Sequence, residues 1–151
     1  MSELKRTILY QAHLDAGATM VDFGGWDMPI QYPEGIIAEH LYCRRHCGIF
    51  DVSHMGRIDV EGPDQVAFLQ HVLSSNVLAL DLNQAQYCII PDANGYAIDD
   101  AYLYRFEEGK YFLVINAGNI DKDWAHLMNE AKNFDVKLTN VSDKYAAIAV
   151  Q

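Results

Sequence analysis

The sequence is short of the residue types that mark several specialised classes of protein. Its 151 residues include three cysteines, and an odd number in a chain of this size does not make a disulfide framework. No apolar run approaches the roughly 20 residues that a membrane-spanning helix requires, and the first residues lead into no signal region. We therefore expect a soluble intracellular protein without membrane contact.

Basic residues are also scarce. Eleven lysines and arginines stand against 21 acidic residues, which gives a formal net charge of −10. Binding to nucleic acid relies on a basic face, so this balance argues against a nucleic-acid partner. Half of the residues are hydrophobic and about a fifth are charged, which is typical of a folded protein. No linker or repeat divides the chain, and its length suits a single domain over residues 1–151.

One cluster has a spacing that metal ligands can have. His40, Cys43 and Cys47 would share one face of a helix, at positions i, i+3 and i+7. A tetrahedral zinc site needs a fourth ligand, and neither a fourth ligand nor a CxxC pair is evident. Cysteine is often a small buried apolar residue, and that interpretation accounts for both thiols. We expect no metal.

Hydrophobic periodicity predicts a mixture of helices and strands. Helices are expected over residues 35–47, 64–73 and 119–133, and strands over 50–52, 57–60, 86–90, 97–106, 111–117, 136–141 and 145–150. In the last helix we expect a core face of Ile120, Trp124, Leu127, Met128 and Ala131, with Asp121, Asp123 and Glu130 elsewhere. The pattern indicates an α+β fold, an antiparallel sheet with a hairpin meander that is packed by about three helices.

The Asp99-Asp100 pair interrupts the middle strand of the meander. Successive strand residues point to opposite faces, so Asp100 shares a face with Tyr102 and Tyr104 while Asp99 lies on the other. A carboxylate in the middle of a strand is costly to bury unless it is paired or hydrogen-bonded. The pair is therefore a candidate functional site.

Turn lengths predict which residues lie beside Asp100. A four-residue loop over 92–95 would place Asp100 opposite Tyr87, and a three-residue loop over 107–109 would place it opposite Asn116. These residues would form a row across three strands, with Tyr104 close by. A register slip of one residue would turn a partner to the other face. Such a row could hold a flat polar ligand, or it could belong to an ordinary exposed sheet face, and the pattern leaves both interpretations open.

Longer strings in the sequence resemble a known family. They are MVDFGGWDMP at residues 20–29, GIFDVSHMG at 48–56, AQY at 85–87, IDD at 98–100 and VINA at 114–117. In these strings and in their order, the sequence resembles the aminomethyltransferases, or T proteins, of the glycine cleavage system. The resemblance extends over essentially the whole chain. It implies a location in the cytoplasm of a bacterium or in the mitochondrion of a eukaryote, although the sequence shows no transit peptide.

The resemblance implies both a fold and a reaction. Members of this family transfer a one-carbon unit to tetrahydrofolate from an aminomethyl group on the lipoyl arm of the H protein, and they release ammonia. A folate-binding domain of the aminomethyltransferase type is implied, with tetrahydrofolate as the acceptor substrate, the lipoylated H protein as partner and no metal. By the same resemblance Asp100 is the catalytic carboxylate beside the folate. Positions that line the folate pocket in such proteins are matched here by Met55, Tyr87, Tyr104 and Asn116.

Members of the family continue well beyond the length of this sequence. The resemblance therefore implies the N-terminal part of a longer enzyme, with little or no activity by itself. Two alternatives remain open: a folate-binding module that performs no transfer, and a folate-dependent relative in tRNA modification or iron–sulfur assembly. The DVSHMG string and the absence of a KGC-type cysteine motif favour the T protein. Docking of an H protein would need a local basic patch, for which Arg44, Arg45 and Arg57 are candidates.

Overall fold

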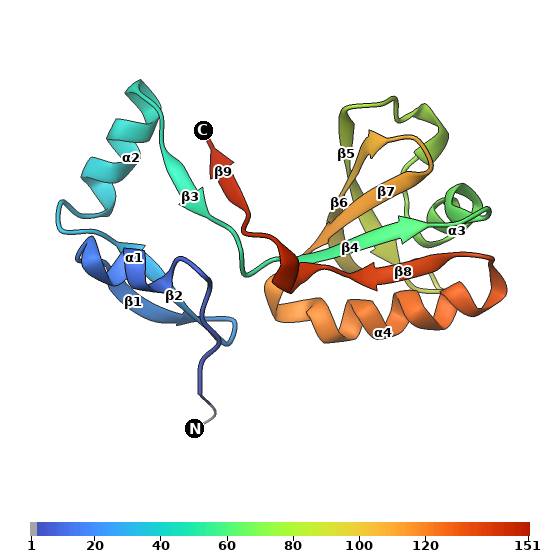
Figure 1. Ribbon diagram of the computed structural model, residues 1–151, viewed down its shortest axis with the longest axis horizontal. Helices are drawn as coiled ribbons and strands as arrows, with labels where there is room; N and C mark the ends of the chain where they lie inside the picture. The colour runs from blue at the N-terminus through green and yellow to red at the C-terminus, as the bar shows by residue number, and fades with distance from the viewer. Residues whose placement is uncertain (1–2) are drawn as a thin grey trace. The chain divides into compact units, whose positions relative to one another are not determined.

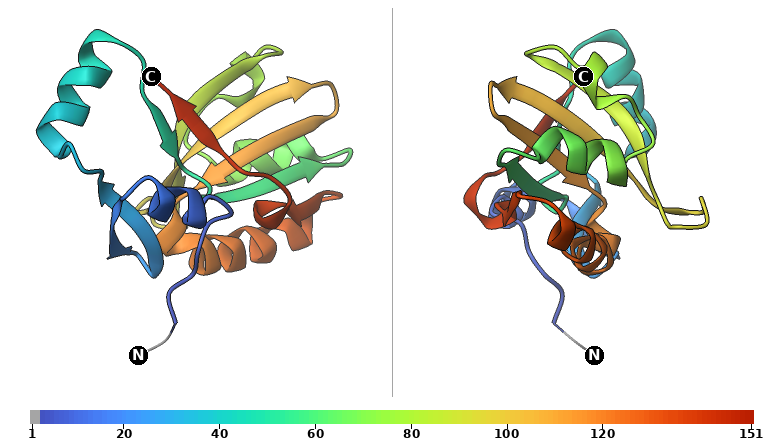
Figure 2. Two further views of the ribbon diagram at one scale, coloured as in Figure 1. Left: turned by 60° about the vertical axis from the view of Figure 1, so that its left-hand side comes forward. Right: turned by 90° about the vertical axis from the view of Figure 1, so that its right-hand side faces the viewer.

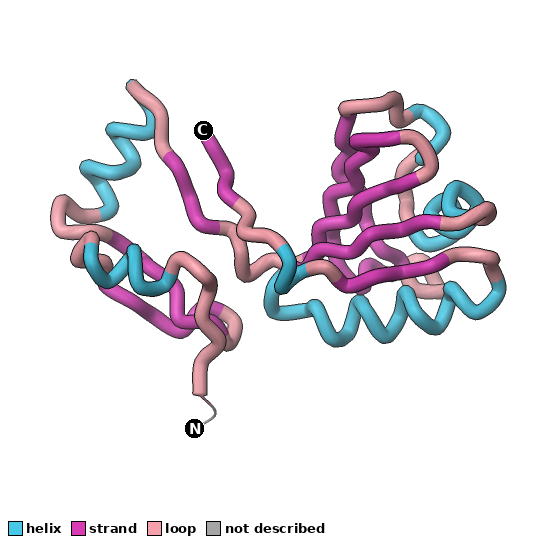
Figure 3. The backbone as a smooth tube through the Cα atoms, in the orientation of Figure 1, coloured by secondary structure: helices cyan, strands magenta, loops and turns pink. Residues whose placement is uncertain are grey.

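The computed structural model describes residues 3–151, which fold as two compact units. The first unit runs to His54 and also contains Lys144–Gln151, and the second unit is Met55–Asp143. Both units combine helices with strands, as the colours of Figure 3 show, and the named strands pair in antiparallel fashion, so the predicted α+β class is confirmed. The single domain expected over residues 1–151 stays a prediction. Within residues 3–151, no helix has the length and apolar character needed to cross a membrane.

The first unit contains short helices and paired strands. In chain order they are α1 (Tyr10–Asp15), β1 (Thr19–Phe23), β2 (Trp26–Gln31), α2 (Ile36–Arg45), β3 (Ile49–Asp51) and β9 (Ile148–Val150). β1 and β2 form an antiparallel hairpin. β9, which lies beside β3 in Figures 1 and 2, pairs with it in antiparallel fashion. α2, β3 and β9 lie within about three residues of the segments that the sequence predicts.

Neither α1 nor the hairpin of β1 and β2 is predicted by the hydrophobic pattern. The turn of the hairpin is Gly24-Gly25, between the paired residues Phe23 and Trp26, and the two glycines have φ angles of 59° and 85°. A type I′ turn needs positive φ at both central residues, a conformation that glycine adopts without strain. The Gly-Gly pair is therefore the local signal for this hairpin.

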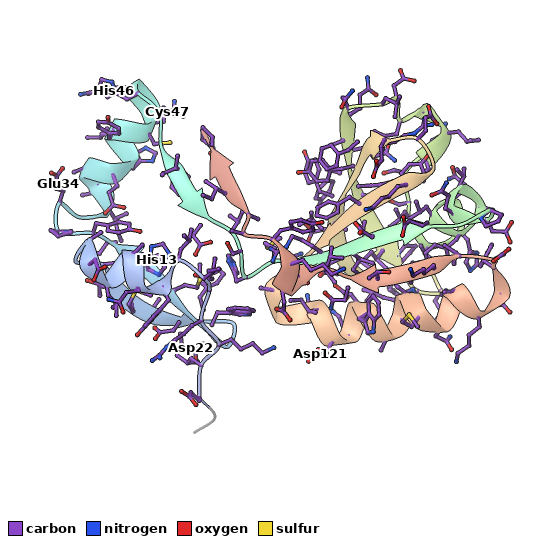
Figure 4. The ribbon with its side chains drawn as sticks, viewed as in Figure 1. His13, Asp22, Glu34, His46, Cys47 and Asp121 are labelled. Atoms are coloured by element: carbon purple, nitrogen blue, oxygen red, sulfur yellow. The ribbon has the colours of Figure 1, made fainter. Side chains whose placement is uncertain are left out.

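A buried hydrogen-bond network joins the elements of the first unit. His13 of α1, labelled in Figure 4, lies within hydrogen-bond distance of the Tyr32 hydroxyl (Nδ1 to O, 2.8 Å) and of the Asp51 carboxylate (Nε2 to Oδ2, 3.0 Å). The Thr7 hydroxyl donates to the same carboxylate oxygen (2.6 Å), and the Ser53 amide donates to the other (2.9 Å). Burial alone would raise the pKa of Asp51, but the hydrogen bonds outweigh burial and hold that pKa below its usual value.

The second unit is built on a five-stranded antiparallel sheet with the strand order β5-β6-β7-β4-β8. Its strands are β4 (Gly56–Glu61), β5 (Gln84–Pro91), β6 (Ala97–Glu107), β7 (Lys110–Ile115) and β8 (Lys137–Asn140). Its α-helices are α3 (Gln65–Val72) and α4 (Ile120–Glu130), and α4 runs alongside β8 in Figure 1. Short 3₁₀ helices occupy Val77–Ala79, Ala117–Asn119 and Ala131–Asn133, and a fourth, Ser142–Lys144, spans the point where the chain returns to the first unit. β5, β6 and β7 form the predicted meander, which is confirmed.

One face of this sheet, the core face, packs against α3 and α4. Its side chains are almost completely buried: Ile58, Val60, Ala101, Leu103, Leu113 and Ile115. The helices add Phe68, Leu69 and Leu127 to the same hydrophobic core. Apolar burial of this extent is the main stabilising contribution to the second unit.

The opposite face of the sheet, the open face, carries polar and aromatic side chains. Tyr87 is 54% exposed and Tyr102 is 45% exposed, which contrasts with the fully buried core face. Strand alternation places Asp100 on the open face with these tyrosines and Asp99 on the core face, as the sequence predicts.

The predicted core face of α4 is partly wrong. Leu127 is buried as expected, but Met128 is 42% exposed. Asp123, which we expected away from the core, is completely buried. Residues four apart in a helix share a face, so Asp123 and Leu127 point inward together. A hydrophobicity pattern assigns a carboxylate to the solvent, and here tertiary packing overrides that assignment.

The acid sensitivity of folding should depend on Asp51. Because the pKa of Asp51 is lowered in the folded state, its contribution to stability is present above the pKa of the unfolded chain and is lost as the pH falls through the folded value. Each hydrogen bond to a charged group contributes about 1.5–3 kcal/mol. We expect Asp51→Asn to lower the thermal unfolding midpoint near neutral pH and to flatten its fall in acid. Asp15→Asn, which changes an exposed carboxylate, is the control, and equal acid slopes in all three proteins would contradict the prediction.

Two neighbouring residues of α4 provide a test of the observed helix face. Leu127→Ala removes a fully buried side chain and should cost about 2–5 kcal/mol of the free energy of unfolding. Met128→Ala removes a side chain that is largely in solvent and should cost less than about 1 kcal/mol. Urea unfolding of both variants measures the difference, and similar losses would mean that the helix is turned as the hydrophobic pattern alone predicts.

Candidate functional site

The site is built on a row of residues that crosses the middle of the five-stranded sheet. β6 and β7 pair Ala101 with Ile115, so the next position places Asp100 opposite Asn116, as predicted. The predicted three-residue loop is wrong, because Glu107 pairs with Lys110, and a register shift between Tyr104 and Glu107 offsets the shorter turn. β4 and β7 pair Gly56 with Ile115, and Met55 directly precedes β4 at this end of the strand. The register therefore brings Asp100 and Asn116 together, and the role of Met55 stays a prediction.

The predicted pairing of Tyr87 with Asp100 is wrong by two residues. Asp100 pairs with Ile89, and Tyr87 pairs with Tyr102. The loop after Pro91 is one residue longer than predicted, because Pro91 pairs with Ala97, and a register shift between Ile90 and Pro91 adds the second residue. A shift of two keeps the same face, so Tyr87 still lies diagonally beside Asp100 on the open face.

Tyrosine rings cover the open face next to Asp100. The ring centroids of Tyr87 and Tyr102 are 5.9 Å apart, and those of Tyr102 and Tyr104 are 5.7 Å apart. Phe106 continues the series, with its ring stacked on Tyr104 at 5.3 Å. The structure thus brings the predicted site residues Tyr87 and Tyr104 together through Tyr102, which the sequence-based site did not include, although strand alternation had placed it on this face.

The Asn116 side chain is the polar centre of the site. Its amide nitrogen donates to Oδ1 of Asp100 (2.9 Å), to the main-chain oxygen of Asp100 (3.2 Å) and to Oδ1 of Asp99 (3.0 Å). Asn116 directly follows β7, so its side chain can reach both neighbouring aspartates although they point to opposite faces of the sheet. These bonds hold the Asp100 carboxylate in one place on the open face.

Negative charge from Asp100 reaches its neighbours. Partial burial and then the Asp100 carboxylate, which also hydrogen-bonds with the phenol, raise the pKa of Tyr87. Burial raises the pKa of Tyr104. On the core face, burial and the same carboxylate raise the pKa of the Cys88 thiol to about 11, so that this thiol is protonated and unreactive at neutral pH.

On the core side of the sheet, behind Asp100, lies a further carboxyl group that the sequence did not predict. Asp123 of α4 is buried and hydrogen-bonds with the Asp99 carboxyl group. Burial and that neighbour raise the pKa of Asp123 to about 7. Burial alone would raise the pKa of Asp99 as well, but hydrogen bonds from Asp123 and Asn116 hold it below its usual value. The local sequence carries no signal for this pair, since the two aspartates are 24 positions apart.

Chemically, the open face offers one fixed carboxylate, one amide and several phenol rings. A carboxylate accepts hydrogen bonds from N–H groups, and aromatic rings provide flat apolar surfaces for stacking. This combination suits a flat heterocycle that carries N–H donors. Among residues 3–151, no group of three or more histidines, cysteines, aspartates and glutamates has the arrangement of a metal site.

The chain is similar to a known family and to several curated proteins. It matches the model of a family described as the GCVT N-terminal domain over residues 9–151. An aminomethyltransferase of Deinococcus deserti is 53% identical over 148 residues, which are 98% of this chain and 41% of that protein. An aminomethyltransferase of Thermus thermophilus is 47% identical over 148 residues, 98% of this chain and 42% of that protein.

A solved structure shows the same fold. The crystal structure of glycine cleavage system aminomethyltransferase T from Bartonella henselae matches with a TM-score of 0.93 at 38% sequence identity, and the match covers 98% of this chain and 40% of that chain. The chain spans about two-fifths of the length of the curated relatives that it matches.

The raised pKa of Tyr87 provides a test of the site geometry. Asp100→Asn removes the negative charge beside the phenol, so the phenolate becomes easier to form and the pKa of Tyr87 should fall towards its usual value. Tyrosine labelled with ¹³C at the hydroxyl-bearing ring carbon reports this titration by NMR. Asp143→Asn, at an exposed aspartate, should leave Tyr87 unchanged. An unaltered Tyr87 pKa in Asp100→Asn would mean that the two side chains do not meet.

Proposed function

The chain belongs to the GCVT N-terminal domain family, and on this premise we propose that it forms the folate-handling part of an aminomethyltransferase. The proposed reaction transfers a methylene group to tetrahydrofolate from the aminomethyl-lipoyl arm of the H protein and releases ammonia. The proposal treats residues 1–151 as a single domain at the N-terminal end of the longer fold. By itself this chain would have little or no transfer activity, because its relatives use a longer chain.

The observation that carries the proposal is the fixed Asp100 carboxylate on the open face. Asn116 holds it at 2.9 Å, and tyrosine rings lie beside it. The pterin ring of tetrahydrofolate is a flat heterocycle with N–H donors, so a carboxylate next to aromatic rings suits its recognition. The residues present therefore fit tetrahydrofolate as the acceptor substrate, with Asp100, Tyr87, Tyr104, Asn116 and Met55 as the proposed contacts.

Asp100 would perform two tasks in the transfer. As an acceptor of hydrogen bonds it would orient the folate so that its nucleophilic nitrogen faces the methylene group. As a fixed negative charge it would stabilise positive charge that develops near that nitrogen while ammonia leaves. Asn116 supports both tasks, because its amide restricts the carboxylate without neutralising it. Tetrahydrofolate supplies the attacking nitrogen when it is bound.

The proposed partner is the lipoylated H protein, and the proposed compartment is the bacterial cytoplasm. Of the three arginines considered for docking, Arg57 is excluded because it is only 3% exposed and donates to the main-chain oxygen of Ser142. Arg44 and Arg45, in the last turn of α2, are exposed and remain candidates for contact with an acidic partner.

The alternative functions are a folate-binding module without transfer activity and a folate-dependent relative in tRNA modification or iron–sulfur assembly. The second alternative is disfavoured by the names of the relatives, which are aminomethyltransferases. The first differs from the main proposal in kinetics only, so a transfer assay in the longer enzyme separates them.

Binding of tetrahydrofolate to this 151-residue chain is the first test. Isothermal calorimetry should detect weak binding that becomes about tenfold weaker in Asp100→Ala, because a charge-assisted hydrogen bond is lost. Asp121→Ala removes an exposed carboxylate from α4 and should bind as the unchanged protein does. Binding that is equal in all three proteins would contradict the proposed role of Asp100.

Turnover provides the second readout. In a full-length aminomethyltransferase that carries this sequence, Asp100→Asn should keep folate contact but lose much of the rate of methylene transfer, since the amide cannot stabilise positive charge. The assay supplies aminomethylated H protein and tetrahydrofolate and measures ammonia. An unchanged rate would reject Asp100 as the catalytic carboxylate.

A further inference from the structure

Two carboxyl groups face one another beneath the candidate site, and neither is used in the proposed reaction. Asp99 extends from the core face of β6, and Asp123 extends from the inward face of α4. The side chain of Asp123 is 0% exposed, so water does not solvate its charge. Each group is the hydrogen-bond partner of the other.

Such a contact requires a proton. A carboxylate has acceptors only, so two ionised carboxylates cannot hydrogen-bond with each other. Within residues 3–151, no N–H or O–H group donates to either oxygen of Asp123 or to Oδ2 of Asp99. Two adjacent buried anions without donors would be strongly unfavourable, and a single shared proton removes one charge and supplies the missing donor.

The surroundings decide which of the two groups keeps the proton. Asp99 accepts hydrogen bonds from the Asn116 side chain, the Asp100 amide and the Asn119 side chain, all of which favour its ionised form. Asp123 lacks such donors, so it is the protonated member. The other charges near Asp123 are Lys122 on its own helix and Asp100 on β6. The Lys122 ammonium donates to the main-chain oxygen of Ile98 (2.7 Å), which also fastens α4 to the start of β6.

We propose that Asp123 is a positioning residue: it donates a proton to Asp99, and the resulting pair holds the Asn116 amide against Asp100. The chain of contacts runs from Asp123 to Asp99, from Asp99 to the Asn116 nitrogen (3.0 Å) and from that nitrogen to Asp100 (2.9 Å). With the proton in place, the amide lies between two anions, one on each face of the sheet. Loss of the proton would surround the same amide with three anions and disturb the position of Asp100. The effect on folate rests on the proposed function, whereas the proton-sharing pair does not.

The proton itself is measured by NMR on the chain labelled with ¹³C at aspartate carboxyl carbons. One carboxyl carbon should titrate near neutral pH, far above the usual range of about 3.9. That titration should disappear in Asp123→Asn and persist in Asp121→Asn, whose side chain is exposed on the same helix and is labelled in Figure 4. The proposal is overturned if every aspartate titrates in the usual range, or if the neutral titration survives in Asp123→Asn.

The positioning role is measured by tetrahydrofolate affinity in two variants of the same residue. Asp123→Asn retains a neutral donor of the same shape, so affinity should stay within about twofold of the unchanged protein. Asp123→Leu keeps the volume but removes the donor, so affinity should fall about tenfold. Equal losses in both variants would overturn the positioning role. If the unchanged chain binds no tetrahydrofolate, the proposed function fails. In that case, and equally if Asp123→Leu does not fold, the NMR titration still decides whether the two carboxyl groups share a proton.

Discussion

The arrangement of the candidate site depends on one amide, the side chain of Asn116. Strand alternation sends Asp99 and Asp100 to opposite faces of the sheet, so no residue within a neighbouring strand could contact both carboxylates equally well. Asn116 directly follows the end of β7, and from there its nitrogen reaches Oδ1 of each aspartate. The amide thereby connects the buried side of the sheet to its open side, and the position of Asp100 depends on what lies behind it.

The two faces of the sheet differ in burial and in the side chains that they carry. On the core face, α3 and α4 cover residues that are almost completely buried, and this burial holds the strands in register. On the open face, Tyr87 and Tyr102 remain about half exposed around the carboxylate. Contiguous exposed apolar surface of this kind commonly marks a binding surface.

The sequence predicts the site only as well as it predicts the strand register, which depends on the turns between the strands. The predicted placement of Asp100 opposite Asn116 agrees with the register and with a direct hydrogen bond, although the turn between β6 and β7 is one residue shorter than predicted and a register shift offsets the difference. The pairing of Tyr87 failed, because a longer loop and a bulge between β5 and β6 each displaced the register by one residue. The two displacements together moved Tyr87 along the strand and kept it on the correct face. Loop length and bulges depend on packing around the turn, which local sequence does not specify.

By itself the sequence determined the α+β class, the meander, the face on which Asp100 lies and the family, because strand alternation and long motifs are local properties of the chain. The tertiary structure alone decided that Asp123 is buried against Asp99 and that His13 contacts Asp51. Both contacts join residues that are distant in sequence, 24 and 38 positions apart. A local pattern assigns a polar residue to the solvent-exposed surface. Only the packing of a helix against a sheet or strand shows that the residue is buried and that another side chain has taken the place of water as its hydrogen-bond partner.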